Sequence, residues 1–167
     1  MMPDFKMKTC CFTGHRDIAP GDVPKILGRV REILEPLIQN GVSFFGVGGA
    51  VGFDMIAAEY LIDLRDNHEK SIKIISVLPF PDWRSKWTAE QFARQETIMK
   101  KSDKTVFVQR EYSKDVYLAR DRKLVDESGF CISYCNRKIG GTAYTVRYAM
   151  KKGLCVYNAS SWDINQL

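Results

Sequence analysis

Residues 43 to 64 read SFFGVGGAVGFDMIAAEYLIDL, and this stretch decides the fold class. It opens with an apolar run typical of a buried β-strand, and residues 53 to 64 are apolar around much of a helical circumference. Between them Gly46, Gly48 and Gly52 fall as GxGxxxG, one residue longer than the dinucleotide fingerprint GxGxxG, and no Gly-Lys-Ser/Thr follows to make a P-loop. The stretch predicts a strand, a tight glycine turn and a helix whose N-terminus suits an anion.

The same alternation extends over the rest of the chain. Further strands are predicted at 8–14, 71–80, 104–109, 129–135 and 154–160, and further helices at 24–41, from Thr88 onward, at 114–127 and at 140–153. Thr88 and Gln91 form a capping box at the start of their helix, and Gly41 and Gly153 end two others. Strands separated by helices need parallel crossovers, so we expect one Rossmann-like α/β domain over residues 1–167, with a doubly wound, mainly parallel sheet and helices on both faces.

Composition points to an ordinary globular protein. The 167 residues are 45% hydrophobic and 27% charged, and the formal net charge of +5 comes from scattered Lys and Arg side chains, which is only a weak indication of nucleic-acid binding. The sequence shows no signal peptide and no long apolar run, so a cytoplasmic location without membrane contact is expected. None of the five cysteines shows metal-ligand spacing with His15 or His68; we interpret them as small buried hydrophobes and expect no metal.

The residues just after each strand are the candidates for a site, because ligands of open α/β sheets bind outside the carboxyl ends of the strands. The turns at these positions carry Gly14, His15 and Arg16; Gly48, Gly49, Gly52 and Asp54; Pro79 to Arg84; and Gly140, Gly141 and Thr142. Two of these turns lead into helices, where glycine lets a phosphate approach unpaired backbone N–H groups. A strand order of 3-2-1-4-5 would separate those two turns by three strand spacings, about 14 Å, which fits an extended nucleotide.

Several side chains near these turns allow more than one interpretation. Arg16 is a charge-matched phosphate donor. His15 is a general acid or base, a phosphate donor or a packed ring, and Asp54 either favours the helix dipole or accepts a ribose hydroxyl. Glu59 is the other carboxylate near the first glycine turn, so Asp54, Glu59 and His15 are the candidate catalytic residues. Arg120 and Asp121 fall on a helix whose charged face is ordinarily solvated.

Together, several segments resemble the YpsA-like branch of the SLOG superfamily, which joins the Smf/DprA proteins to the LOG nucleotide hydrolases. They read FTGHR, GGAVGFDMIAAE, LPFPDWRSKW and ARDRKLVDESGFCISYCNRKIGGTAYTVRYAMKKG. The resemblance implies a Rossmann-like domain that binds a nucleotide-derived ligand, with a pocket lined by Gly14, His15, Arg16, Gly48, Gly49, Gly52, Asp54, Gly140, Gly141 and Thr142 and with Arg120 nearby.

Two positions depart from the pattern of this superfamily. Asp121 stands where the family carries asparagine after its arginine, which puts the contacts from that helix in doubt. Thr145 stands at the position of the catalytic glutamate of the LOG hydrolases, and the proline of their motif is missing as well. The resemblance therefore does not carry LOG activity over to this chain.

Three functions remain open on the sequence. The first is binding of a mononucleotide or an ADP-ribose-type ligand in a regulatory or sensing role. The second is hydrolysis of an N-glycosidic or phosphate bond in such a ligand. The third is nucleic-acid binding as in the DNA-processing relatives, helped by aromatic residues such as Trp83, Trp87 and Tyr112. A homodimer is a further expectation for a small α/β domain, because two-fold assemblies are common.

Overall fold

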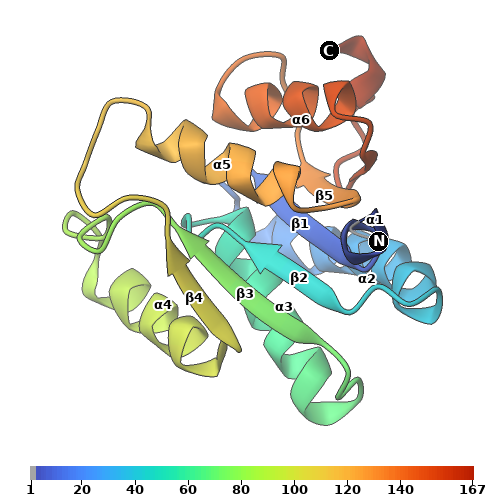
Figure 1. Ribbon diagram of the computed structural model, residues 1–167, viewed down its shortest axis with the longest axis horizontal. Coiled ribbons are helices and arrows are strands. Elements are labelled where there is room, and N and C mark those ends of the chain that lie inside the picture. The colour runs from blue at the N-terminus through green and yellow to red at the C-terminus, as the bar shows by residue number, and fades with distance from the viewer. Residues whose placement is uncertain (1–2) are drawn as a thin grey trace.

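The computed structural model describes residues 3–167 and contains one parallel sheet with the strand order β4-β3-β2-β1-β5-β6 (Figure 1). The strands are β1 (Thr9–Gly14), β2 (Phe44–Val47), β3 (Lys73–Leu78), β4 (Lys104–Phe107), β5 (Phe130–Tyr134) and β6 (Cys155–Asn158). Every pairing is parallel, with Cys11 opposite both Gly46 and Cys131. The predicted α/β fold with a mainly parallel sheet is confirmed.

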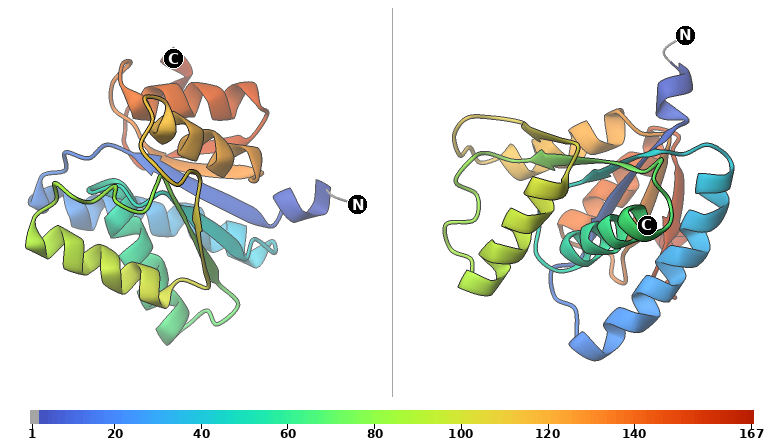
Figure 2. Two further views of the ribbon diagram at one scale, coloured as in Figure 1. Left: turned by 60° about the vertical axis from the view of Figure 1, so that its left-hand side comes forward. Right: turned by 90° about the horizontal axis from the view of Figure 1, so that it is seen from below.

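Helices cover both faces of this sheet (Figures 1 and 2). One face carries α2 (Val23–Gln39), α3 (Phe53–Asn67) and α4 (Ala89–Lys101), and the other carries α5 (Val116–Asp126) and α6 (Gly141–Lys151). The short α1 (Pro3–Lys6) precedes β1, and 3-10 turns lie at Pro20–Asp22 and Ile164–Gln166. None of the helices found in residues 3–167 is both long and apolar enough to cross a lipid bilayer.

The strand order corrects one expectation. The order 3-2-1-4-5, from which the spacing of the two glycine turns was calculated, is not the order observed, because β4 adds outside β3 and β5 lies beside β1. The reversal of strand order therefore lies between β1 and β5. As a result, the turns after β2 and β5 are two strand spacings apart, about 10 Å, rather than three.

Successive side chains along the central strands are buried on opposite faces of the sheet. Phe12 packs with Phe45 and Phe53 on the side of α2 and α3, while Cys11 packs with Leu124 and Cys131 on the side of α5. The centre of β1 is buried on both faces of the sheet, which explains the apolar run from Cys10 to Phe12, while Thr9 and Thr13 on either side of it are buried threonines. Cys10, Cys11, Cys131 and Cys135 are buried free thiols, as predicted. The prediction is wrong for Cys155, which is exposed because it begins the edge strand β6.

The helix ends follow the predicted signals. The Thr88 hydroxyl accepts from the Gln91 backbone N–H at 3.1 Å, and the Gln91 side chain accepts from the Thr88 N–H at 3.1 Å, so the capping box is present. Gly41 and Gly153 adopt φ values of 99° and 85° directly after α2 and α6. These caps fix where each helix ends and hence where the following strand enters the sheet.

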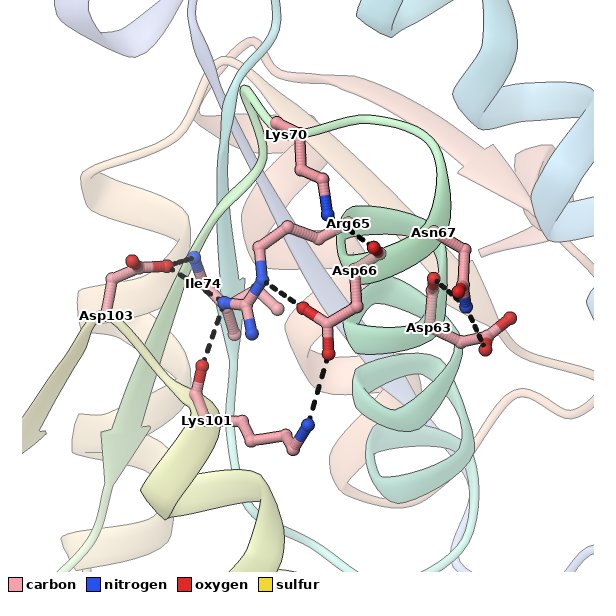
Figure 3. Close-up of polar contacts among 8 residues, drawn as sticks. All are labelled: Asp63, Arg65, Asp66, Asn67, Lys70, Ile74, Lys101 and Asp103. Carbon is pink, nitrogen blue, oxygen red and sulfur yellow. Dashed lines mark hydrogen bonds and ion pairs between the residues drawn. The ribbon is translucent and has the colours of Figure 1, made fainter.

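A polar network ties α3, α4 and β3 together at the edge of the sheet opposite the carboxyl ends (Figure 3). The Asp103 carboxylate accepts from the Ile74 N–H at 2.8 Å and from Arg65 Nη1 at 3.3 Å, and Arg65 Nη1 also donates to the Lys101 carbonyl at 2.8 Å. Lys101 in turn pairs with Asp66 at 3.2 Å. The network gives the Lys101 carbonyl, at the C-terminal end of α4, a hydrogen-bond donor and fixes α4 against α3.

Candidate functional site

A pocket of about 350 Å³ opens at the carboxyl ends of the strands, and we call it the carboxyl-edge pocket. It lies at the β1/β5 reversal of strand order, where ligands of open α/β sheets bind. The predicted site residues that line it are Gly14, His15, Arg16, Asp54, Arg120, Gly140, Gly141 and Thr142. The fold thus brings together residues from the turns after β1, β2 and β5 and from α5.

The glycines of the first glycine turn do not line the pocket but contact residues that do. They are Gly48, Gly49 and Gly52. The Gly48 carbonyl accepts from Arg120 Nη1, and the Gly49 carbonyl accepts from Trp83 Nε1 at 2.9 Å. Gly52 has φ of 84°, and a Cβ there would lie 2.4 Å from the Arg16 carbonyl oxygen, so only glycine lets the two turns approach. Direct contact of this turn with a phosphate stays a prediction.

The N-terminus of α6 forms the opposite wall. Gly140 is its N-cap residue with φ of 106°, a value that L side chains rarely adopt, and no side chain caps the first backbone N–H groups. A Cβ on Gly140 or Gly141 would meet no atom within 4 Å, so space is open over this helix end. Uncapped N–H groups at the positive end of a helix dipole are suited to an anionic group.

Asp54, in the first turn of α3, lies on the floor of the pocket and is 6% exposed. Its Oδ2 accepts from the Ala50 N–H at 3.4 Å, whereas Oδ1 is buried and without a partner within residues 3–167. Burial raises the pKa of this carboxyl to about 7, although the Arg120 charge acts in the opposite direction. The Asp54 carboxyl can therefore exchange a proton near neutral pH or accept a hydrogen bond from a ligand hydroxyl.

His15 is 4% exposed and is held by the turn after β5. Its Nε2 accepts from the Asn136 backbone N–H at 3.0 Å, which leaves the proton of the neutral ring on Nδ1. Burial and the nearby Arg137 charge lower the pKa of His15, so the neutral form prevails. Of the alternatives open on the sequence, this geometry fits a neutral Nδ1–H donor better than a general base.

The solvated charged face expected for this helix is wrong at Arg120, which is buried in a network that links three elements. Its Nε donates to Asp121 Oδ1 at 2.6 Å, and its Nη1 donates to the Gly48 carbonyl. The Thr145 hydroxyl lies 3.1 Å from Asp121 Oδ2 and 2.9 Å from the Gly141 carbonyl, either of which it can donate to. Asp121 thus connects Arg120 on α5 to the first turn of α6.

The arginines of the pocket differ in how their charge is balanced. Arg120 pairs with Asp121, and Arg137 forms a two-bonded ion pair with Asp17 at 2.9 and 3.3 Å. Arg16 is exposed and has no carboxylate oxygen within 4.0 Å in the described chain. It is therefore the arginine best able to pair with an anionic ligand.

Glu59 and the aromatic residues near the pocket differ from the sequence-based expectations. Glu59 lies outside the pocket, where its carboxylate pairs with Arg94 at 2.6 and 3.0 Å. Trp83, Trp87 and Tyr117 form an aromatic wall of the pocket. Trp83 and Trp87 were named from the sequence only as residues near the third strand or as aids to nucleic-acid binding, and Tyr117 was not named. Their position just after β3 and at the start of α5 was the available signal, since both places face the carboxyl edge.

Between residues 3 and 167, no three His, Cys, Asp or Glu side chains converge as metal ligands.

Comparison with known proteins gives a family and a fold. The model of the YpsA family, described as the YspA SLOG family, matches residues 19–164. A UPF0398 protein of Halalkalibacterium halodurans is 28% identical over 119 residues, which are 70% of this chain and 62% of that protein. The chain thus spans less than two thirds of this relative.

Two solved structures share the fold. DNA processing protein A from Helicobacter pylori, described for its single-stranded DNA binding mode, superposes with a TM-score of 0.61 at 20% identity over 93% of this chain and 66% of its own. DNA processing protein A from Streptococcus pneumoniae gives a TM-score of 0.64 at 16% identity over 93% of this chain and 50% of its own. At this level of identity the likeness concerns the fold.

Proposed function

The chain belongs to the YpsA SLOG family, and from this premise we propose that its carboxyl-edge pocket binds a nucleotide or a nucleotide-derived small molecule in a regulatory or sensing role. The ligand class is a mononucleotide or an ADP-ribose-type molecule. Its phosphate would face the uncapped N-terminus of α6 and Arg16, and a ribose hydroxyl would lie beside Asp54, which also lines the pocket.

The observation that carries this proposal is the open end of α6. The backbone at Gly140 and Gly141 has free space in front of it, no side chain occupies the cap, and Arg16, without a paired carboxylate, lines the same pocket. Donors that are already oriented, next to an unpaired guanidinium, bind an anion at little cost in reorganisation.

The substitution Gly141→Asp tests the site without straining the backbone. Gly141 does not have a positive φ and has room for a Cβ, and an acidic side chain near a helix N-terminus favours folding. We expect the melting temperature of the free protein to be kept or raised, while the carboxylate repels a phosphate and removes stabilisation by ligand. The measurement is thermal unfolding of both proteins with AMP, ADP, ADP-ribose and NAD⁺.

In the wild type, a ligand at a hundredfold excess over its Kd should add about 2.7 kcal/mol to the unfolding free energy. Gly28→Asp is the matched control, because Gly28 is exposed on α2, away from the pocket, with nothing within 4 Å of its Cβ position. A wild type that no member of the nucleotide panel stabilises would overturn the proposal, as would a Gly141→Asp variant that responds as fully as the control.

Hydrolysis of the bound ligand is a second candidate, favoured by Asp54. A buried carboxyl with a pKa of about 7 and one unpartnered oxygen has the properties of a general acid. Asp54→Asn should then abolish product release while ligand binding persists, whereas Glu59→Gln, which lies outside the pocket, should leave release unchanged. Ligand recovered intact after long incubation with the wild type would exclude this activity.

Single-stranded DNA is a third candidate because one structure of the same fold is described for its binding of that polymer. This function predicts that the protein shifts the electrophoretic mobility of single-stranded DNA at low salt, and that the affinity falls steeply as the salt concentration increases. Absence of such a shift would leave the small-molecule proposal alone.

A further inference from the structure

A second cavity of about 680 Å³ adjoins the carboxyl-edge pocket, and we call it the aromatic cavity. It lies where the segment between β3 and α4 runs beside the loop that leads from β4 to α5, green and gold at the left of Figure 1. Arg16, Trp83, Trp87 and Tyr117 line both spaces. The two are therefore neighbours on one surface and share a wall.

Five aromatic rings line this cavity: Phe80, Trp83, Trp87, Tyr112 and Tyr117. Phe80 meets Tyr112 and Tyr117 edge to face, with ring centroids 5.9 and 6.3 Å apart, and Trp83 meets Trp87 in the same way at 5.8 Å. Tyr112 is 65% exposed and Tyr117 is 39% exposed, so much of the surface of both rings is open to a ligand. Exposed aromatic rings in a groove are the usual stacking platform for nucleobases.

The charges at the cavity favour a phosphate-linked group over a purely apolar one. Arg16 and Lys86 contribute cations and Asp82 an anion, and neither cation has a carboxylate within 4.0 Å in residues 3–167. Arg16 stands at the junction with the carboxyl-edge pocket. A phosphate placed at this junction would pair with Arg16 while the groups on either side of it entered the two cavities.

We propose that the aromatic cavity takes the base of a second nucleoside, joined through a phosphate at Arg16 to the nucleotide in the carboxyl-edge pocket. The ligand is then of dinucleotide type, with one nucleoside in each cavity. This inference rests on the proposed function, because it extends the ligand of that same site.

The test compares mononucleotides with matched dinucleotides by isothermal titration calorimetry. The probes are AMP, GMP, CMP and UMP, the corresponding 5′-phosphorylated dinucleotides, and NAD⁺. We expect at least one dinucleotide to bind more tightly than its mononucleotide. Tyr112→Ala should weaken that dinucleotide about 5- to 150-fold, the range for loss of one base–ring stack, and leave the mononucleotide unchanged.

Matched variants separate stacking and charge from general damage. Tyr112→Phe keeps the ring and should bind like the wild type. Lys86→Gln should weaken only the dinucleotide, while Lys100→Gln, an exposed lysine on α4 outside both cavities, should weaken neither probe. Because Tyr112 is largely exposed, its variants are expected to keep the wild-type melting temperature.

The two proposals fail differently. If mononucleotides bind but no dinucleotide binds more tightly, or if Tyr112→Ala weakens both probes equally, the second subsite is wrong and the proposed function stands. If no nucleotide of either kind binds the wild type, both are wrong.

A longer oligonucleotide identifies the source of the second base. Affinity that rises further from dinucleotide to oligonucleotide assigns the cavity to a nucleic-acid strand, and affinity that stays level assigns it to a free dinucleotide. Either result supports a base in the aromatic cavity.

Discussion

The burial of Asp54 should be detectable in solution through the pH dependence of the unfolding free energy. The folded protein holds a proton on its carboxyl up to a pKa of about 7, whereas the unfolded chain releases it near the ordinary value of 3.8. The folded state therefore binds more protons between these two values. The resulting stabilisation is fully present below the unfolded pKa and is lost as pH rises through 7.

We expect the unfolding free energy of the wild type, compared with that of Asp54→Asn, to fall by roughly 2–3 kcal/mol between pH 5 and pH 8. Urea unfolding of both proteins at the two pH values measures this difference. His15, whose pKa is lowered by burial, acts in the opposite direction, but its effect is the same in both proteins and cancels. Parallel pH profiles for the two proteins would show that Asp54 is an ordinary ionised carboxylate.

Individual site residues are predictable from the sequence where the residue type has a fixed physical role. Gly140 was recognised because a helix N-terminus after a strand requires a permissive backbone, and its φ of 106° has that cause. Trp83 was named in the turn after the third strand, but its packing was not predicted, because a tryptophan in a loop is compatible with either a ligand contact or core packing. Its bond to the Gly49 carbonyl depends on a contact between residues far apart in the sequence, and no local pattern encodes such a contact.

Among the elements, α5 and α6 are joined through Asp121, which bonds to Arg120 and to Thr145. The Asp121 carboxylate neutralises Arg120 beside the pocket and also raises the pKa of Asp54. Asp121→Asn should therefore strengthen binding of an anionic nucleotide by up to roughly tenfold, about 1.4 kcal/mol. Calorimetric titration measures this change, with Asp126→Asn on the same helix but outside the pocket as the control of equal charge. Equal affinities for the two variants would contradict a role for Arg120 in ligand binding.

The junction of α3, α4 and β3 depends on Asp103 (Figure 3). Asp103→Ala leaves the N–H of the fully buried Ile74 without its carboxylate acceptor, at a cost of about 1–3 kcal/mol in unfolding free energy. Asp63→Ala is the comparison, because that carboxylate accepts only from Asn67 on the same exposed helix surface. Denaturant unfolding should show a clear loss for the first variant and less than about 0.5 kcal/mol for the second. Equal losses would mean that the network adds nothing to stability.

For the whole molecule, the alternation of strands and helices predicted the fold class but not the order of the strands. A βα unit of given length can add to either side of the growing sheet, and local periodicity does not distinguish the two sides. The burial of the strands in the structure reflects their places in the sheet. The short β4 is nowhere fully buried, as suits an edge strand, whereas Cys131, Ile132 and Ser133 of β5 are buried, as suits an interior one. Treating β4 as an edge strand would have placed β5 beside β1.

The measurement that most directly tests the central claim is backbone amide mapping by nuclear magnetic resonance, with ¹⁵N-labelled protein titrated with the nucleotide that stabilises it most. We expect the amide signals of Gly141, Thr142 and Ala143 to shift together with that of Arg16, and Gly141→Asp to abolish these shifts. Shifts confined to the groove between α2 and α3, or no shifts with any nucleotide, would contradict a ligand site at the carboxyl edge of the sheet.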